Sequence, residues 1–127
     1  MIGTKIRIVT GKVVVEAVLR DETPGVAALL DALPFESRAN TWGEEVYFEA
    51  PFSLDLEPDA RQIVEPGTVC FWTEGSSIAL PYGRTPISGP DGKPKLAARC
   101  NLLGQLIGDA RALAKVRNGD RIRVEAA

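Results

Sequence analysis

The amino-acid sequence predicts a mainly β domain, either a closed barrel or a sandwich. Short runs of β-forming residues, about eight of them, recur between turn signals, and only two segments carry helix signals. The 127 residues are 45% hydrophobic, which is enough for one core without a metal or a disulfide. Closure into a barrel would remove the exposed sheet edges. No linker or repeat divides the chain, so we expect a single domain over residues 1–127.

The first elements are a hairpin and a helix. Apolar and polar residues alternate through residues 5–20, and Thr10-Gly11 supplies the turn between two strands. Thr23 is typical of a helix N-cap and Pro24 of the first helical position. An apolar stripe at helical spacing follows, and Pro34 ends the helix.

The middle of the chain carries three predicted strands. Residues 45–49, 68–72 and 78–82 are rich in β-branched and aromatic side chains. Residues 50–66 contain several prolines and acids, which favours either an irregular excursion or an edge strand at 52–56.

The last third begins with a loop and ends with a strand. Residues 88–94 are the most turn-rich stretch, and we expect a mobile surface loop there. A strand follows at about 99–107, and Asp109 then caps a short helix that ends at Asn118-Gly119. The chain closes with a strand over 121–125.

Composition excludes several classes of function. The sequence contains no histidine, which rules out a histidine base, a Ser-His-Asp triad and histidine metal ligands. We therefore expect no metal, and because no phosphate-binding glycine motif is present we expect no cofactor. The net charge is −2, and the basic residues near the C-terminus alternate with core residues, so we expect no nucleic-acid partner.

The sequence also bears on the compartment. No segment reaches the ~18 apolar residues of a membrane span, and the N-terminus lacks the apolar stretch of a signal peptide. We therefore expect a cytoplasmic protein without a membrane partner. Cys70 and Cys100 lie in apolar runs, which favours buried, inert thiols, although neighbouring strands could bring them close enough to pair.

The candidate site centres on an acidic residue in the strand 45–49. Glu45 and Tyr47 share a face, whereas Glu44 faces the other way. If that face lines a pocket, Glu45 is a desolvated acid with a raised pKa, suited to donating a proton or anchoring a ligand. If the face points outward, the same residues form a solvated edge.

Aromatic side chains and one arginine complete the candidate site. Trp42, Trp72 and Tyr82 lie near turns, where such rings either pack in the core or line a shallow groove. Arg84 follows Tyr82 and precedes Pro86, so it either presents a guanidinium to a ligand or is an ordinary surface residue.

Five segments together resemble a family of small prokaryotic cyclophilin-like proteins. They are Leu33-Pro34-Phe35-Glu36-Ser37, Asn40-Thr41-Trp42-Gly43-Glu44-Glu45-Val46-Tyr47-Phe48, Glu65-Pro66-Gly67-Thr68-Val69, Tyr82-Gly83-Arg84-Thr85-Pro86-Ile87-Ser88 and Leu103-Gly104-Gln105-Leu106-Ile107-Gly108. The resemblance implies a closed eight-stranded β-barrel with two short capping helices. Most members of the family have no assigned activity.

The resemblance to true cyclophilins fails at their catalytic arginine. Those enzymes isomerise X-Pro bonds with an Arg in a Phe-His-Arg motif beside an apolar proline pocket. Aligned on Gly43, this chain has Tyr47 and Phe48 where that motif has His and Arg. A twisted amide needs a positioned cation or donor, because its nitrogen gains lone-pair character.

Three hypotheses about function follow. The first is a binding module that holds a small ligand or an extended peptide against Trp42, Glu45, Tyr47, Trp72, Tyr82 and Arg84. The second is a prolyl isomerase with a rebuilt site in which Arg84, with Glu45 as a further catalytic candidate, replaces the missing arginine. The third is a structural or protein-partner role for the acidic region 44–65, including a homo-oligomer.

Overall fold

A computed structural model of the protein describes residues 3–127, and most of its regular structure is antiparallel sheet. The strands are β1 (Lys5–Val9), β2 (Val14–Leu19), β3 (Phe35–Arg38), β4 (Asn40–Thr41), β5 (Glu45–Glu49), β6 (Arg61–Ile63), β7 (Thr68–Trp72), β8 (Ser77–Pro81), β9 (Lys95–Ile107) and β10 (Arg121–Ala126). The helices are α1 (Pro24–Ala32) and the 3-10 helix η1 (Ala110–Lys115). The mainly β prediction is therefore confirmed.

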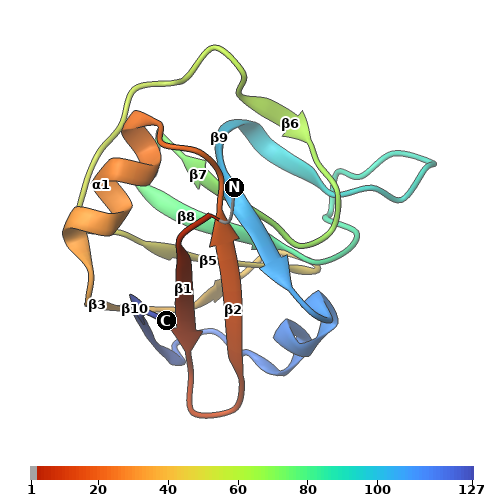
Figure 1. Ribbon diagram of the computed structural model, residues 1–127. Helices are drawn as coiled ribbons and strands as arrows, with labels where there is room; N and C mark the ends of the chain where they lie inside the picture. Colours follow the sequence, from red (N-terminus) through yellow and green to blue (C-terminus); the bar gives the residue numbers. More distant parts are fainter. Residues whose placement is uncertain (1–2) are drawn as a thin grey trace.

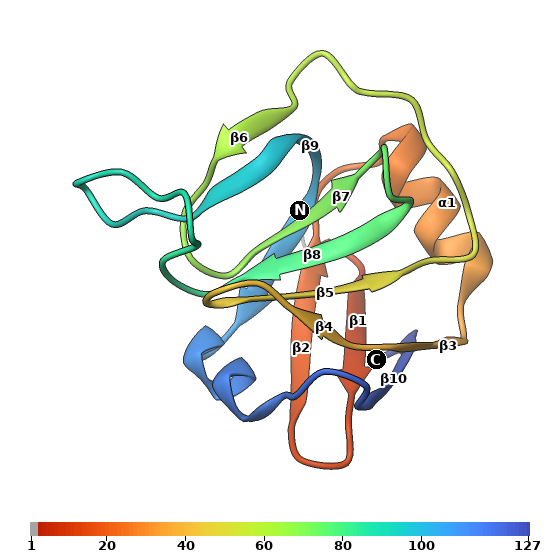
Figure 2. The same ribbon diagram turned by 180° about the vertical axis from the view of Figure 1, so that it is seen from behind.

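The strands pair in the order β3-β10-β1-β2-β9-β7-β8-β5-β4, and β6 pairs separately with β9. The long strand β9 connects the two halves of the fold, because it pairs with β2 near its end, with β7 in its middle and with β6 near its start. Figures 1 and 2 show β1 and β2 crossing over β5, β7 and β8, so that the sheet wraps around the space that the core fills.

The expectation of a closed eight-stranded barrel is wrong in two respects. The described residues form ten strands, and no hydrogen-bonded ladder joins the two end strands β3 and β4. These strands follow each other directly in the chain, so they cannot lie side by side. Ala39 between them exchanges backbone hydrogen bonds with Asp120 and Gly119 instead. A groove of about 430 Å³ between β3, β4 and the end of β5 lies at this open seam.

Both predicted helices form, and each begins at the predicted cap. The Thr23 side chain accepts a hydrogen bond from the Val26 N–H, and Pro24 is the first helical residue. The Asp109 carboxylate accepts from the Arg111 N–H at the start of η1. Each helix contributes buried side chains to the main core, including Val26 and Leu29 from α1 and Leu113 from η1.

Other boundaries differ from the sequence expectation. No strand was expected at β3, β4 or β6, and β9 begins at Lys95 rather than near residue 99. Residues 52–56 form no strand, so the irregular alternative for this region is correct. Phe52 nevertheless stacks on Phe71, with ring centroids 5.2 Å apart, which attaches this segment to the core.

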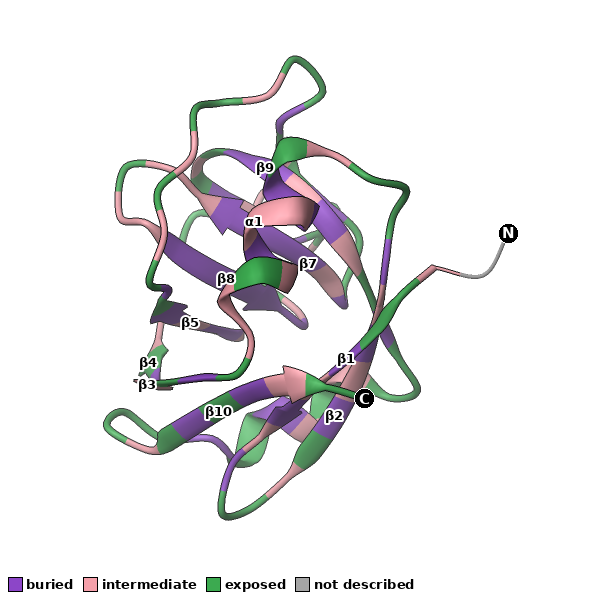
Figure 3. Cartoon of the chain, turned by 60° about the vertical axis from the view of Figure 1, so that its left-hand side comes forward, coloured by how far each residue is buried: buried purple, intermediate pink, exposed green. Residues whose placement is uncertain are grey.

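Strands β5, β7 and β8 have two buried faces. On the inner face, Val46, Phe48, Phe71, Ile78 and Leu80 belong to the main core. On the outer face a second, smaller cluster forms around Cys70, Ala79, Leu96 and Cys100, with Tyr47 and Trp72 packed against it. In Figure 3 these strands are largely coloured as buried, whereas β10 alternates between buried and exposed residues. The outer cluster is where the candidate site lies.

Within residues 3–127, no helix is both long and apolar enough to cross a membrane.

Candidate functional site

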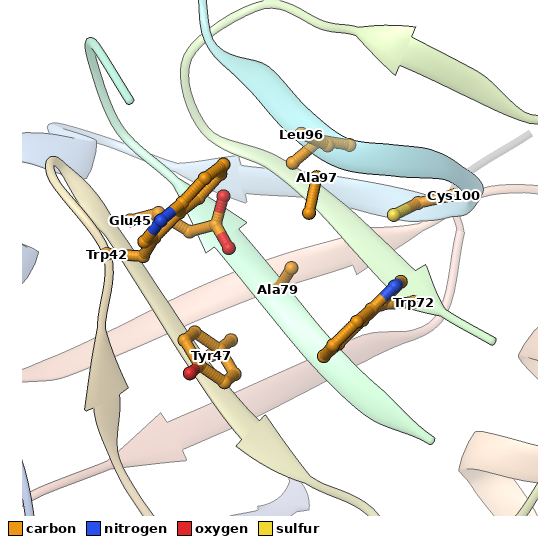
Figure 4. A pocket seen from close by; sticks show the side chains of 8 residues that line it. All are labelled: Trp42, Glu45, Tyr47, Trp72, Ala79, Leu96, Ala97 and Cys100. Atoms are coloured by element: carbon orange, nitrogen blue, oxygen red, sulfur yellow. The ribbon is translucent and has the colours of Figure 1, made fainter. Parts of the chain in front are cut away.

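A cavity of about 210 Å³ opens on the outer face of β5, β7 and β8 and is bounded on one side by the first half of β9. We call it the outer pocket. It is lined by Trp42, Glu45, Tyr47, Trp72, Ala79, Leu96, Ala97 and Cys100. Figure 4 shows the two indole rings on opposite sides of the cavity, with Ala79 and the Glu45 carboxyl between them in that view.

The outer pocket exists because a small residue lies in the middle of a row of larger ones. Ala79 on β8 pairs with Tyr47 on β5 and with Cys70 on β7, so these three side chains lie side by side on the outer face. The methyl group of Ala79 leaves space that a larger side chain would fill. Tyr47 and Trp72 meet edge to face beside that space, with ring centroids 6.3 Å apart and an interplanar angle of 89°.

Glu45 is the charged residue of the outer pocket. The residue is only 6% exposed, and its Oε1 atom has no hydrogen-bond partner among the described residues. Burial penalises the charged form and raises the pKa of Glu45 to about 7. A carboxyl with this pKa is close to half ionised at neutral pH, so a bound group can change its protonation state at small cost.

A second polar atom of the pocket also lacks a partner. The Trp72 Nε1–H is buried and has no acceptor among the described residues. Buried polar groups are nearly always hydrogen-bonded, and an unpaired one costs about 1–3 kcal/mol. Both residues line the outer pocket, and each unpaired atom is itself buried.

The neighbouring acid Glu44 has the opposite environment, as the alternation along β5 predicts. Its carboxylate accepts hydrogen bonds from the Arg111 guanidinium at 2.6 Å and from the Arg84 N–H at 2.9 Å. These bonds hold the pKa of Glu44 below its ordinary value. Glu44 and Glu45 therefore do not share a site.

Of the six residues expected at the site, four line the outer pocket and two lie elsewhere. Tyr82 is buried in the main core, since it follows Leu80 on the inner face of the sheet, and the Arg111 guanidinium lies 5.8 Å from its ring centroid. Arg84 is exposed, and its guanidinium donates to the Gly89 carbonyl within its own loop. Neither residue is among those that line the outer pocket.

Half of the pocket lining was not singled out by sequence reasoning. Leu96 and Ala97 belong to the part of β9 that precedes the expected start of this strand near residue 99, and Ala79 carries no chemical signal by itself. A period-two reading of β8 would have placed Ala79 on the outer face. Its pairing with Tyr47 depends on the register between distant strands, which no local pattern reveals.

Cys70 and Cys100 are both buried free thiols in the outer cluster. Burial raises the pKa of Cys70 well above its ordinary value and that of Cys100 to about 12. Both thiols therefore stay protonated and unreactive at neutral pH. Within residues 3–127, no group of three or more acidic or cysteine side chains gathers in a way that could hold a metal ion.

The chain belongs to the family described as Cyclophilin-like, whose sequence model matches residues 4–125. Its fold is similar to the solution structure of a hypothetical protein from Archaeoglobus fulgidus, with a TM-score of 0.83 and 34% sequence identity. That similarity covers 99% of this chain and 96% of the archaeal one. No protein of curated function matches the chain.

Proposed function

We propose that this protein is a binding module that holds a small ligand, or one side chain of an extended peptide, in the outer pocket. The observation that carries the proposal is the combination, in one cavity, of three aromatic rings and the carboxyl group of Glu45, which has no ion-pair or hydrogen-bond partner at its Oε1 atom among the described residues. A volume of about 210 Å³ is below the usual range for drug-sized ligands. It suits a group of a few heavy atoms.

The isomerase hypothesis has less support. It needs a cation or donor at the twisted amide, and none of the eight pocket-lining residues is an arginine or a lysine. Arg84, the expected substitute, donates to Gly89 instead. Phe48, which aligns with the cyclophilin arginine, is fully buried in the main core. A partner-binding role for region 44–65 stays a prediction.

The proposal is tested by NMR with a fragment set of neutral, cationic and anionic compounds and one capped Ala-Pro dipeptide. At least one compound should shift the methyl resonances of Ala79, Leu96 and Ala97. Replacing either Trp42 or Tyr47 by Ala should weaken its binding by several-fold, because each ring is a wall of the pocket.

A pocket-filling variant provides a matched control. Ala97→Phe adds a ring at the exposed rim of the outer pocket and should abolish binding. Ala114→Phe adds the same ring to an exposed position on η1 and should leave binding unchanged. If no compound shifts the pocket methyls, or if both phenylalanine variants bind alike, the outer pocket is not a ligand site.

A further inference from the structure

We infer that the ligand of the outer pocket carries a small organic ammonium group, held between the rings of Trp42, Tyr47 and Trp72 and facing the Glu45 carboxylate. This inference rests on the proposed function and names the chemical class of its ligand. It follows from two independent features of the pocket, which are its aromatic walls and its single unpaired acid.

The aromatic walls suit a cation. The three rings come from three separate segments, and Tyr47 and Trp72 stand perpendicular to each other, so their surfaces enclose the cavity from different directions. All three residues are only half-buried, which leaves ring surface free of protein contact. An ammonium group within about 6 Å of a ring centroid is attracted by the negative face of the ring, and tryptophan provides the strongest attraction.

The unpaired acid selects the sign of the ligand charge. The described residues form eight ion pairs, and none of them includes Glu45. A carboxylate buried without a counter-ion is costly, and a cation placed beside it removes that cost. A neutral ligand leaves the cost in place, and an anionic ligand adds repulsion. The pocket therefore favours a positive group over the other two classes.

Among the described residues that line the outer pocket, Glu45 is the only one with an acidic or basic side chain. The titratable groups around it are the Tyr47 phenol on β5, the Cys70 thiol on β7 and the Cys100 thiol on β9; Glu74 lies close enough to Cys100 to influence it. From β8 the pocket receives only Ala79. Because burial keeps both thiols protonated, the charge of the pocket changes when Glu45 gains or loses its proton.

Two small compounds of the same shape separate the effect of charge from the effect of size. Choline is a small organic ammonium compound with a hydroxyl group, and 3,3-dimethylbutan-1-ol has the same shape and hydroxyl but no charge. The two compounds are therefore a matched pair of probes.

The test is an NMR titration of the full chain with both probes at pH 8 and pH 6, following the pocket methyl and indole resonances. At pH 8 choline should bind about tenfold more tightly than its neutral analogue. With a pKa of about 7 for Glu45, the ionised fraction falls about tenfold between pH 8 and pH 6. Choline affinity should fall several-fold over the same interval, because the rings still attract the cation when Glu45 is protonated, and the affinity of the neutral analogue should not fall.

Two variants locate the effect. Glu45→Gln should weaken choline binding at pH 8 and remove its pH dependence, while the aromatic rings still favour choline over its neutral analogue. Glu44→Gln removes a charge from the adjacent residue, which pairs with Arg111 outside the pocket, and should behave as the wild type. The pH comparison on the wild-type chain does not depend on either variant folding.

The outcomes separate this inference from the proposed function. Equal binding of the two probes at the pocket methyls, or unchanged choline affinity in Glu45→Gln, would overturn the ammonium inference while a binding module remains. Binding of the neutral or anionic fragments alone would overturn it in the same way. If no probe and no fragment binds, both fail together.

Discussion

The buried acid Glu45 should make the stability of the protein fall as the pH rises. Its pKa is about 7 in the fold, against 4.5 for an ordinary glutamate. At ~1.36 kcal/mol per pH unit, this difference amounts to about 3 kcal/mol. That is a large part of the ~5–15 kcal/mol by which a domain is usually stable.

The sign follows from which state holds the proton. Below pH 4.5 the carboxyl is protonated in both states, so it imposes no penalty. Between pH 4.5 and 7 the unfolded chain loses the proton while the folded chain keeps it, and the free energy of unfolding therefore decreases with pH. Above pH 7 the full penalty of about 3 kcal/mol is present.

Urea unfolding of the wild type and Glu45→Gln at pH 4.5 and pH 8 measures this penalty. The amide does not titrate, so the variant should gain about 3 kcal/mol relative to the wild type between the two pH values. The m-values should match, which shows that both proteins unfold to the same extent. Comparing the two proteins at each pH cancels the contribution of every other titrating group.

Glu44→Gln is the control, and its effect should be nearly the same at pH 4.5 and pH 8. The pKa of Glu44 is lowered by Arg111 and by the Arg84 N–H, so its ionised form stabilises the fold. This contribution is present above the ordinary pKa of 4.5 and is lost only as the pH falls further, so the variant should be less stable than the wild type by a similar amount at both pH values. The account of Glu45 as an unpaired buried acid would be refuted by either of two results. The free energy of unfolding of Glu45→Gln could exceed that of the wild type by the same amount at both pH values, or by less at pH 8 than at pH 4.5.

Three further substitutions test the fold by thermal or urea unfolding. Phe48→Ala should cost about 3–5 kcal/mol, because the ring is fully buried in the main core, and a cost under 1 kcal/mol would show that the core does not depend on it. Gly104→Ala should cost at least about 1–3 kcal/mol, since the added Cβ would lie 2.3 Å from the Val18 carbonyl oxygen; a neutral effect would contradict the β2–β9 register. Thr23→Ala should cost about 1 kcal/mol by removing the hydrogen bond to the Val26 N–H, whereas Thr23→Ser should retain most of it, and equal losses in both would exclude a capping role.

Local patterns predicted the elements whose signals lie within a few residues. The hairpin of β1 and β2, the helix α1 and strand β7 all form where alternation, caps and turn residues indicated them. Strands β3 and β6 carry no such signal, because they are short and most of their residues are polar or charged. They form through pairing with β10 and β9, which follow much later in the chain. The open seam likewise depends on contacts between distant parts of the chain, because Ala39, between β3 and β4, hydrogen-bonds with Gly119 and Asp120.

The candidate site was predictable only where one strand carried the information. Period-two alternation placed Glu45 and Tyr47 on one face, and the structure puts that face at a cavity together with Trp42 and Trp72. Whether the cavity binds a ligand stays a prediction. Tyr82 was misplaced because its position in the pleat, and not its proximity to turns, decides which way it faces. The residues of β9 that line the pocket could be found only from the tertiary contacts between β9 and the other strands.

The two faces of β5 have different roles. One face packs in the main core, and the other lines the outer pocket. Val46 and Phe48 anchor the strand from within, while Glu45 and Tyr47 project on the opposite side. Substitutions confined to Glu45, Tyr47, Ala79 and Ala97 would therefore alter the lining of the outer pocket while the side chains of the main core stay unchanged.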